Sequence, residues 1–147
     1  LRSGTENILG IYALAKAFKK YYAKIEENYS KATELKKIVT DGIDGNLFRI
    51  LSPDNGSPYV VSLSAVKMRG AVLQNMLDDE GVVIGTGSAC NSRSPHSRVI
   101  SSFEKSKEVL DGAIRLSFSF DTTKEEVEKA VGLLNEKAKI LYGKINL

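Results

Sequence analysis

Apolar residues recur at helical spacing from Glu6 to about Ile38, and this run constrains the fold more than any other feature of the chain. The stripe consists of Ile8, Ile11, Tyr12, Ala15, Phe18, Tyr22, Ile25, Tyr29, Ala32 and Leu35. Lysine and glutamate side chains fill the opposite side, and Thr5 is the predicted N-cap. We therefore expect one long helix that packs on the rest of the chain or on a larger body. A break near residues 28–30 is compatible with the pattern but is not required by it.

A different pattern follows the turn residues at 41–46, where short β-branched stretches alternate with short helical ones. It predicts strands over 47–51, 59–64, 82–84 and 113–120, and helices over 69–80, 99–110 and after residue 123. Gly81 suits the position after a helix, and Thr123 with Glu126 forms a capping-box signature. We expect an α+β chain of two layers, with a long helix over residues 1–40 and a domain over residues 41–147.

The composition excludes several classes of protein. The 147 residues suit a single domain with a core of its own. One cysteine excludes an internal disulfide, and one cysteine with one histidine gives no ligand set for zinc, so we expect no metal. A net charge of +3 does not indicate nucleic acid, and no apolar run is long enough to span a membrane. We expect a reducing, cytoplasmic setting, and the first residue, Leu rather than Met, suggests a piece of a longer protein.

The run Gly85-Thr86-Gly87-Ser88-Ala89-Cys90-Asn91-Ser92 is the strongest candidate for chemistry. Its small residues let a backbone approach a ligand closely, and they lead from a predicted strand into a polar loop. A nucleophilic cysteine needs exposure and a lowered pKa, which Arg93 and Arg98 would provide if the fold brings them near Cys90. The alternative is a buried, unreactive cysteine that packs as a small apolar side chain.

Three further residues carry weaker signals. Arg115 lies in a strand whose alternate residues are apolar. Its planar guanidinium suits a carboxylate, although an arginine on the solvated face of a sheet gives the same pattern. Thr5 stands at the start of the first helix and suits a phosphate, although simple N-capping explains it equally. His96 follows Pro95 in the polar loop and is either a proton shuttle or a surface residue.

Together these segments resemble the NifS-like cysteine desulfurases, which are pyridoxal-phosphate enzymes of the class V aminotransferase group. The matching segments, in the family's order and at about its spacing, are Arg2-Ser3-Gly4-Thr5-Glu6-Asn7, Thr86-Gly87-Ser88-Ala89-Cys90, Ile114-Arg115-Leu116-Ser117 and Thr122-Thr123-Lys124-Glu125-Glu126-Val127. The resemblance covers nearly the whole chain, and the cysteine run is its specific part. It implies the small C-terminal domain of a fold-type I enzyme: a short, mostly antiparallel sheet with helices on one face, preceded by a long helix.

The resemblance also implies a role for each matched residue. Cys90 corresponds to the catalytic cysteine, which takes the sulfur of L-cysteine as a persulfide, releases L-alanine, and passes the sulfur to an acceptor protein in iron–sulfur cluster or thiolation pathways. Arg115 corresponds to the arginine that binds the substrate carboxylate. Thr5 corresponds to a threonine that reaches the pyridoxal phosphate of the neighbouring subunit in a homodimer. The family's cofactor-holding Lys, Asp and His have no counterpart here, so we expect this chain alone to be inactive.

Two other functions remain open. A stand-alone sulfur carrier or scaffold would accept a persulfide on Cys90 from another enzyme, without a cofactor. A related pyridoxal-phosphate aminotransferase or lyase would use the same fold with Cys90 incidental to its activity. Transfer of sulfur from an active desulfurase to Cys90 would indicate the carrier, whereas activity that survives loss of the thiol would indicate the aminotransferase or lyase.

Overall fold

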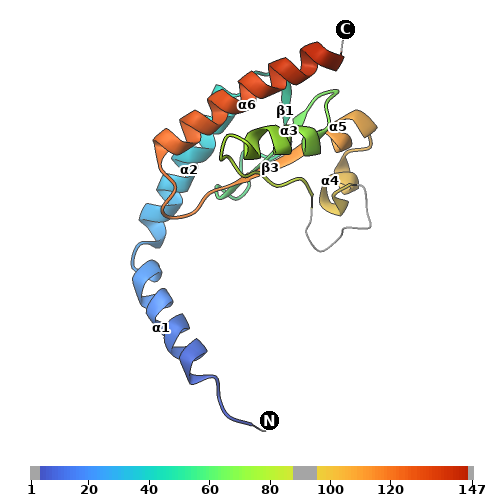
Figure 1. Cartoon of the computed structure of the whole chain (residues 1–147). Helices are drawn as coiled ribbons and strands as arrows, with labels where there is room; N and C mark the ends of the chain where they lie inside the picture. Colours follow the sequence, from blue (N-terminus) through green and yellow to red (C-terminus); the bar gives the residue numbers. More distant parts are fainter. Residues whose placement is uncertain (1–3, 88–95, 146–147) are drawn as a thin grey trace.

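The computed structural model describes residues 4–87 and 96–145 and shows an elongated molecule whose two ends lie far apart (Figure 1). In chain order its elements are α1 (Ile8–Tyr22), α2 (Ile25–Gly42), β1 (Phe48–Ile50), β2 (Val60–Ala65), α3 (Gly70–Asp78), α4 (Arg98–Phe103), α5 (Lys107–Asp111), β3 (Ala113–Ser117) and α6 (Lys124–Ile145). The helices α2 and α6 lie side by side along the body, while α1 projects away from it toward the N-terminus (Figure 1).

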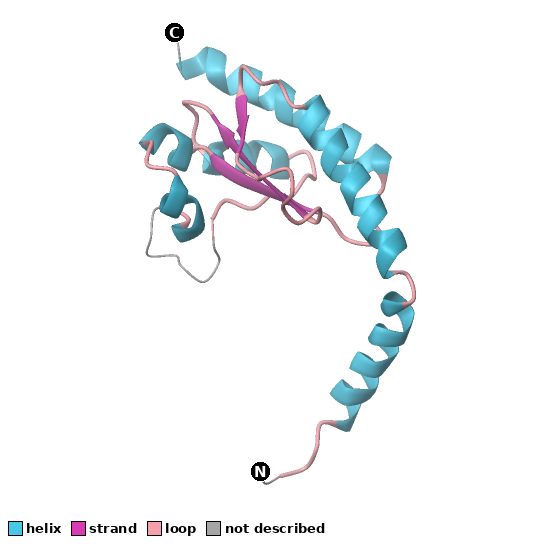
Figure 2. Ribbon diagram, turned by 180° about the vertical axis from the view of Figure 1, so that it is seen from behind, coloured by secondary structure: helices cyan, strands magenta, loops and turns pink. Residues whose placement is uncertain are grey.

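The three strands form one antiparallel sheet in the order β1-β2-β3, which confirms the expected α+β architecture (Figure 2). Strand residues alternate between the two faces, so every second side chain points the same way. On one face Leu63 of β2 lies opposite Ile114 of β3, and both are buried. On the other face Ser62 lies opposite Arg115. The sheet therefore presents one apolar face to a core and one polar face away from it.

The core forms where α2, α3 and α6 cover the apolar face. Leu35 and Val39 of α2 and Leu73 of α3 are completely buried. Facing residues of α6 complete the cluster: Val127, Val131, Leu134 and Ala138. Burying side chains of this size stabilises the fold by roughly 1.5–3 kcal/mol each. On the polar face, α5 covers Ser64, whose hydroxyl donates to the Val109 carbonyl, whereas Arg115 stays exposed.

The N-terminal helix differs from the expectation in two ways. The predicted continuous helix is broken between α1 and α2 at Ala23 and Lys24, earlier than the 28–30 region, and neither residue is a helix breaker. The break lies beside Tyr21, whose ring stacks on Phe120 at a centroid distance of 4.7 Å. The N-cap is Asn7 rather than Thr5, because the Asn7 side chain accepts a hydrogen bond from Gly10 N–H at 2.9 Å.

The predicted strand at 82–84 is also wrong. Residues 82–84 belong to no strand, and the next residue, Gly85, forms an isolated bridge with Arg115 of β3. The weak helix predicted over 99–110 is two short helices, α4 and α5, and the strand predicted to Phe120 ends at Ser117.

Two local predictions are confirmed by their hydrogen bonds. Thr123 N–H donates to Glu126 Oε2 at 2.8 Å and Glu126 N–H donates to Thr123 Oγ1 at 3.2 Å, which is the capping box at the start of α6. Gly81 has a φ of 77°, and its N–H donates to the Asp78 carbonyl while the next N–H donates to Leu77. This is the closing turn that requires glycine after a helix.

The two chain segments proposed as domains, 1–40 and 41–147, share one continuous helix at their boundary, because α2 runs to Gly42. Its inward face belongs to the same core as the sheet and α6. The boundary itself stays a prediction. Among the helices of the described part of the chain, none is long and apolar enough to cross a membrane.

Candidate functional site

Arg115 stands on the open, polar face of the sheet, as its place in the alternation predicts. Its neighbours Ile114 and Leu116 are buried in the core, whereas the Arg115 side chain is exposed. The strand β2 brings Ser62 opposite it. The fold therefore uses the apolar half of β3 for packing and leaves the cation accessible.

The segment that leads toward the cysteine run holds Arg115 from its other side. Gly85 N–H donates to the Arg115 carbonyl at 2.9 Å, and Arg115 N–H donates to the Gly85 carbonyl at 2.7 Å. Two residues later the Gly87 carbonyl accepts a hydrogen bond from Arg115 Nη1 at 3.2 Å. A guanidinium has five N–H donors in a planar fork, so this single bond leaves donors for a ligand carboxylate.

Two small cavities lie near Gly87, and Arg115 lines the first of them. The first, about 180 Å³, is lined by Ser62, Gly87, Val99 and Arg115 among others. The second, about 110 Å³, shares Gly87 with the first and reaches His96 and Asp111. Cavities of this size beside a guanidinium suit a small molecule with a carboxylate rather than a large ligand.

Gln74 of α3 is a supporting residue that the sequence did not single out. Its Nε2 donates to the Ile84 carbonyl at 2.7 Å, and Thr86 Oγ1 donates to its Oε1 at 2.9 Å. The amide therefore fixes the extended segment on both sides of Gly85. The sequence signal is only a polar residue that follows buried Leu73 in a short amphipathic helix, which is too common to predict this contact.

The α4–α5 region is tied to the sheet by buried and charged contacts. Ser64 of β2 is completely buried and its hydroxyl donates to the Val109 carbonyl at 2.8 Å. Arg49 of β1 pairs with Glu104 at 2.8 Å. The backbone N–H of Ser106 donates to the Glu104 carboxylate and lowers its pKa, as do, more weakly, the N–H of Lys105 and the charge of Arg49.

His96 lies near Asp111, with 3.6 Å between Nδ1 and the Asp111 carboxylate. Both side chains are half-buried and both line the smaller cavity beside Gly87. The histidine is therefore partly enclosed rather than a simple surface residue. Its predicted role as a proton shuttle stays a prediction.

The structure does not bring Thr5 to Arg115. Thr5 is exposed and precedes α1, which projects away from the body (Figure 1). The 15 residues of α1 make a helix roughly 22 Å long. Within one chain, Thr5, the predicted phosphate contact, and Arg115, the predicted carboxylate contact, therefore do not form one site.

Cys90 and Arg93 lie outside the described residues, as do Arg2 and Ser3 of the opening motif. For the predicted nucleophile we have only its position in the sequence: Cys90 follows Gly87, a hydrogen-bond partner of Arg115, by three residues. Arg98, the other cation proposed to act on the thiol, is the exposed first residue of α4.

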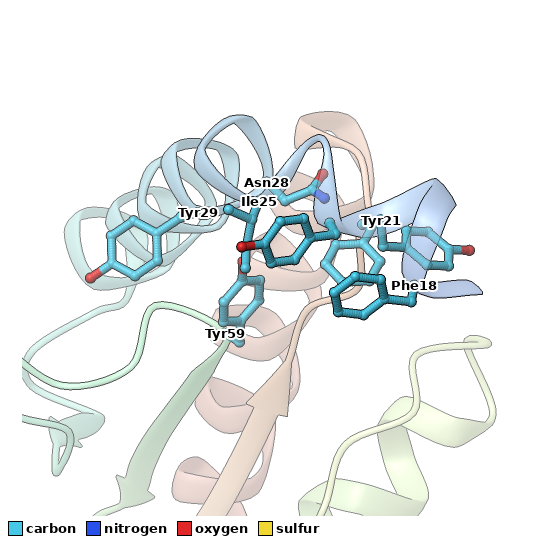
Figure 3. Close-up of a pocket in the computed structure, with 8 residues that line it drawn as sticks. Phe18, Tyr21, Ile25, Asn28, Tyr29 and Tyr59 are labelled. Carbon is cyan, nitrogen blue, oxygen red and sulfur yellow. The ribbon is translucent and has the colours of Figure 1, made fainter. Parts of the chain in front are cut away.

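A larger cavity of about 500 Å³ lies at the break between α1 and α2 (Figure 3). Its lining is almost entirely aromatic and apolar: Phe18, Tyr21, Tyr22, Ile25, Asn28, Tyr29, Tyr59 and Phe120. The rings of Tyr59 and Phe120 meet edge to face at 6.3 Å. None of these side chains is an acid, base or cation at neutral pH, so this hollow offers packing surface rather than catalytic groups.

Chemically, the described residues around Arg115 provide an oriented cation, hydroxyl groups and backbone donors. They can bind and orient a small carboxylate. Within the described ranges there is no group of three His, Cys, Asp or Glu side chains that could hold a metal ion.

Comparisons of the sequence and the fold with known proteins agree on one family. The family model described as Aminotransferase class-V matches residues 1–130. Over 137 residues the chain is 29% identical to cysteine desulfurase IscS of Dictyoglomus turgidum, covering 90% of this chain and 35% of that protein. Over 142 residues it is 32% identical to cysteine desulfurase IscS of Methanosarcina thermophila, and the match covers 92% of this chain and 34% of that protein.

Among solved structures, a NifS-like protein superposes with a TM-score of 0.79 at 29% identity, covering 97% of this chain and 36% of that one. The chain spans about a third of the length of the curated relatives it matches.

Proposed function

The chain belongs to the class V aminotransferase family, and from this premise we propose that it forms part of a cysteine desulfurase. In this proposal Arg115 binds the carboxylate of L-cysteine and Cys90 accepts its sulfur. One observation carries the proposal: Arg115 is exposed, lines a small cavity, and donates a hydrogen bond to Gly87, which belongs to the run that contains Cys90.

The carboxylate contact follows from the geometry of the arginine. A guanidinium binds a carboxylate through two parallel hydrogen bonds, which fix orientation as well as affinity. With the carboxylate fixed, the rest of a small amino acid has few positions left, and a reacting sulfur is held near its attacker. The role of Arg115 is therefore to orient the substrate.

The sulfur transfer balances without a further reactant. One thiol and one cysteine become one persulfide and one alanine: a sulfur–sulfur bond forms at Cys90 and the carbon–sulfur bond of the substrate breaks. The sulfur is oxidised to the persulfide level while the substrate carbon is reduced to a methyl group. A thiolate is the attacking form, so this role requires Cys90 to be deprotonated.

The family depends on pyridoxal phosphate, but the described residues do not fit that cofactor by themselves. None of the described residues that line the two cavities near Gly87 is a lysine. Thr5, the predicted phosphate contact, lies beyond the far end of α1. We therefore assign to this chain contacts with the substrate. We propose that Thr5 binds the cofactor phosphate of a second subunit, because Thr5 is exposed and precedes the projecting helix α1. A sulfur-acceptor protein would then take the persulfide from Cys90.

The test uses the gene product that contains this chain, expressed in full with pyridoxal phosphate. We expect it to release alanine from L-cysteine and to gain the mass of one sulfur atom on Cys90. Cys90→Ser should lose persulfide formation and slow alanine release by at least about 100-fold, because the nucleophile is gone. Arg115→Lys should mainly raise KM for cysteine, because an ammonium lacks the planar fork.

Two outcomes would contradict the proposal. If Cys90→Ser forms persulfide at the unchanged rate, Cys90 is not the acceptor. If the complete protein releases no alanine but Cys90 receives sulfur from a separate active desulfurase, the chain is a sulfur carrier instead.

A further inference from the structure

Arg115 is paired through its backbone with a residue that has no side chain. The two reciprocal hydrogen bonds with Gly85, at 2.9 and 2.7 Å, fix the main chain of both residues. Gln74 holds the residues on either side of Gly85 through the Ile84 carbonyl and the Thr86 hydroxyl. The position of the Gly85 backbone beside Arg115 is therefore set independently of the arginine side chain.

The guanidinium occupies the space that a side chain at Gly85 would need. A Cβ placed on Gly85 would lie 3.0 Å from Arg115 Nη2 and 3.4 Å from Cζ. The first distance is tighter than most Cβ contacts, and the second borders ordinary van der Waals contact. The guanidinium is the end of a flexible side chain, so it would shift by a few tenths of an ångström. The Gly85 backbone does not have the left-handed φ that disfavours alanine. An added methyl group would therefore act on the guanidinium rather than on the main chain.

Gly87 holds the guanidinium in a second way. Its carbonyl accepts the hydrogen bond from Arg115 Nη1 at 3.2 Å. Its φ of 97° lies in the region that side chains avoid, and no atom of the residues that the structure describes lies within 4 Å of where a Cβ would be. Gly87 is thus needed for its backbone conformation, whereas Gly85 is needed for its missing side chain.

We propose that Gly85 and Gly87 are positioning residues for Arg115: the bare backbone of Gly85 gives the guanidinium its place and the Gly87 carbonyl sets its rotation. This rests on the proposed function, in which Arg115 binds the substrate carboxylate. A fixed donor fork is what makes carboxylate binding directional, so a displaced fork binds the carboxylate less well.

The first test observes the guanidinium directly, in the 147-residue chain with ¹⁵N labelling. We expect the Arg115 Nη–H resonance, assigned by its loss in Arg115→Lys, to lie apart from the resonances of freely solvated arginines, because Nη1 donates to the Gly87 carbonyl. In Gly85→Ala it should move toward the free-arginine position, because the added methyl group displaces the guanidinium from that hydrogen bond. Gly132→Ala is the matched control, since a Cβ on that exposed α6 residue meets nothing within 4 Å.

The second test measures desulfuration by the complete gene product. Gly85→Ala should raise KM for L-cysteine roughly tenfold while kcat changes by less than about threefold, since the carboxylate contact is misdirected. In an Arg115→Lys background the same substitution should have no further effect, because it acts only through the guanidinium. Gly132→Ala should match the wild-type protein in both backgrounds.

The proposal is overturned if Gly85→Ala leaves the Arg115 resonance unchanged, or if it lowers activity equally with and without Arg115. A complete protein without desulfurase activity would overturn the proposed function instead, and the resonance measurement would still decide whether Gly85 positions the guanidinium.

Discussion

Single glycines in this fold are required for different physical reasons, and Gly112 shows the most severe case. Its φ is an ordinary −84°, so its backbone conformation does not call for glycine. Its surroundings do, because a Cβ there would overlap the carbonyl oxygen of Ala65 and lie 2.9 Å from the Ser64 hydroxyl oxygen. The close approach is held by the hydrogen bond from Ala65 N–H to the Gly112 carbonyl at 2.9 Å. The junction of α5 and β3 therefore depends on a missing side chain.

We predict that Gly112→Ala destabilises the chain by about 3 kcal/mol, because backbone atoms must separate to admit the methyl group. Gly132→Ala, in open space on α6, should instead stabilise it by about 0.5–1 kcal/mol through helix propensity. Urea unfolding monitored by circular dichroism measures both free energies of unfolding. Equal effects of the two substitutions would show that the space at Gly112 is not limiting.

At the residue scale, the strand pattern predicted which face of the sheet Arg115 takes but not the contacts around it. The alternation of β3 correctly placed Arg115 on the open face, because strand periodicity alone decides which face a residue takes. The contacts from Gly87 and the support from Gln74 were not predictable, because they join residues 28 and 12 positions apart. Only the folded chain brings such residues together.

At the scale of elements, the ion pair between β1 and the α4–α5 junction sets a pH dependence. Hydrogen bonds from Ser106 N–H and Lys105 N–H, together with Arg49, hold the pKa of Glu104 below its ordinary 4.5. A carboxyl whose pKa is lower in the folded state stabilises the fold above its unfolded pKa. That stabilisation is lost as the pH falls through the folded value.

We therefore predict that Glu104→Gln destabilises the chain slightly at pH 7 and that the difference from wild type shrinks below about pH 4.5. Unfolding midpoints across pH 3–7 measure it, with Glu108→Gln on the exposed side of α5 as the control. A difference that grows toward low pH would contradict the sign of this argument.

The elements themselves were largely predictable wherever a local signal exists. The capping box and Gly81 gave the start of α6 and the end of α3, because both motifs are satisfied by neighbouring residues. The break between α1 and α2 has no such signal: Ala23 and Lys24 are good helix formers, and the chain turns where Tyr21 meets the distant Phe120. The segment 82–84 looks like a strand because it is β-branched, but it lacks neighbours for a ladder.

At the scale of the whole molecule, α1 contributes apolar surface without contributing to the core. No residue of α1 is buried, and Leu14 is 71% exposed. Leu35 of α2, the last residue of the predicted apolar stripe, is fully buried. The folded body therefore begins at the break between the two helices.

We predict that Leu14→Ala changes the free energy of unfolding by less than about 0.5 kcal/mol, whereas Leu35→Ala costs about 2–5 kcal/mol. A chain that begins at Lys20, which keeps the Tyr21 contact, should unfold with the same midpoint as the intact chain. Loss of cooperative unfolding in that shortened chain would mean that α1 stabilises the body.

The account as a whole is tested most directly by the mass of the peptide that carries Cys90, after the complete gene product has turned over L-cysteine. We predict a gain of one sulfur atom on Cys90, matched by one alanine released, and the loss of this gain when Arg115 is replaced by alanine. Alanine release with Cys90 unmodified, at a rate that Cys90→Ser does not change, would contradict the assignment of this chain to sulfur transfer.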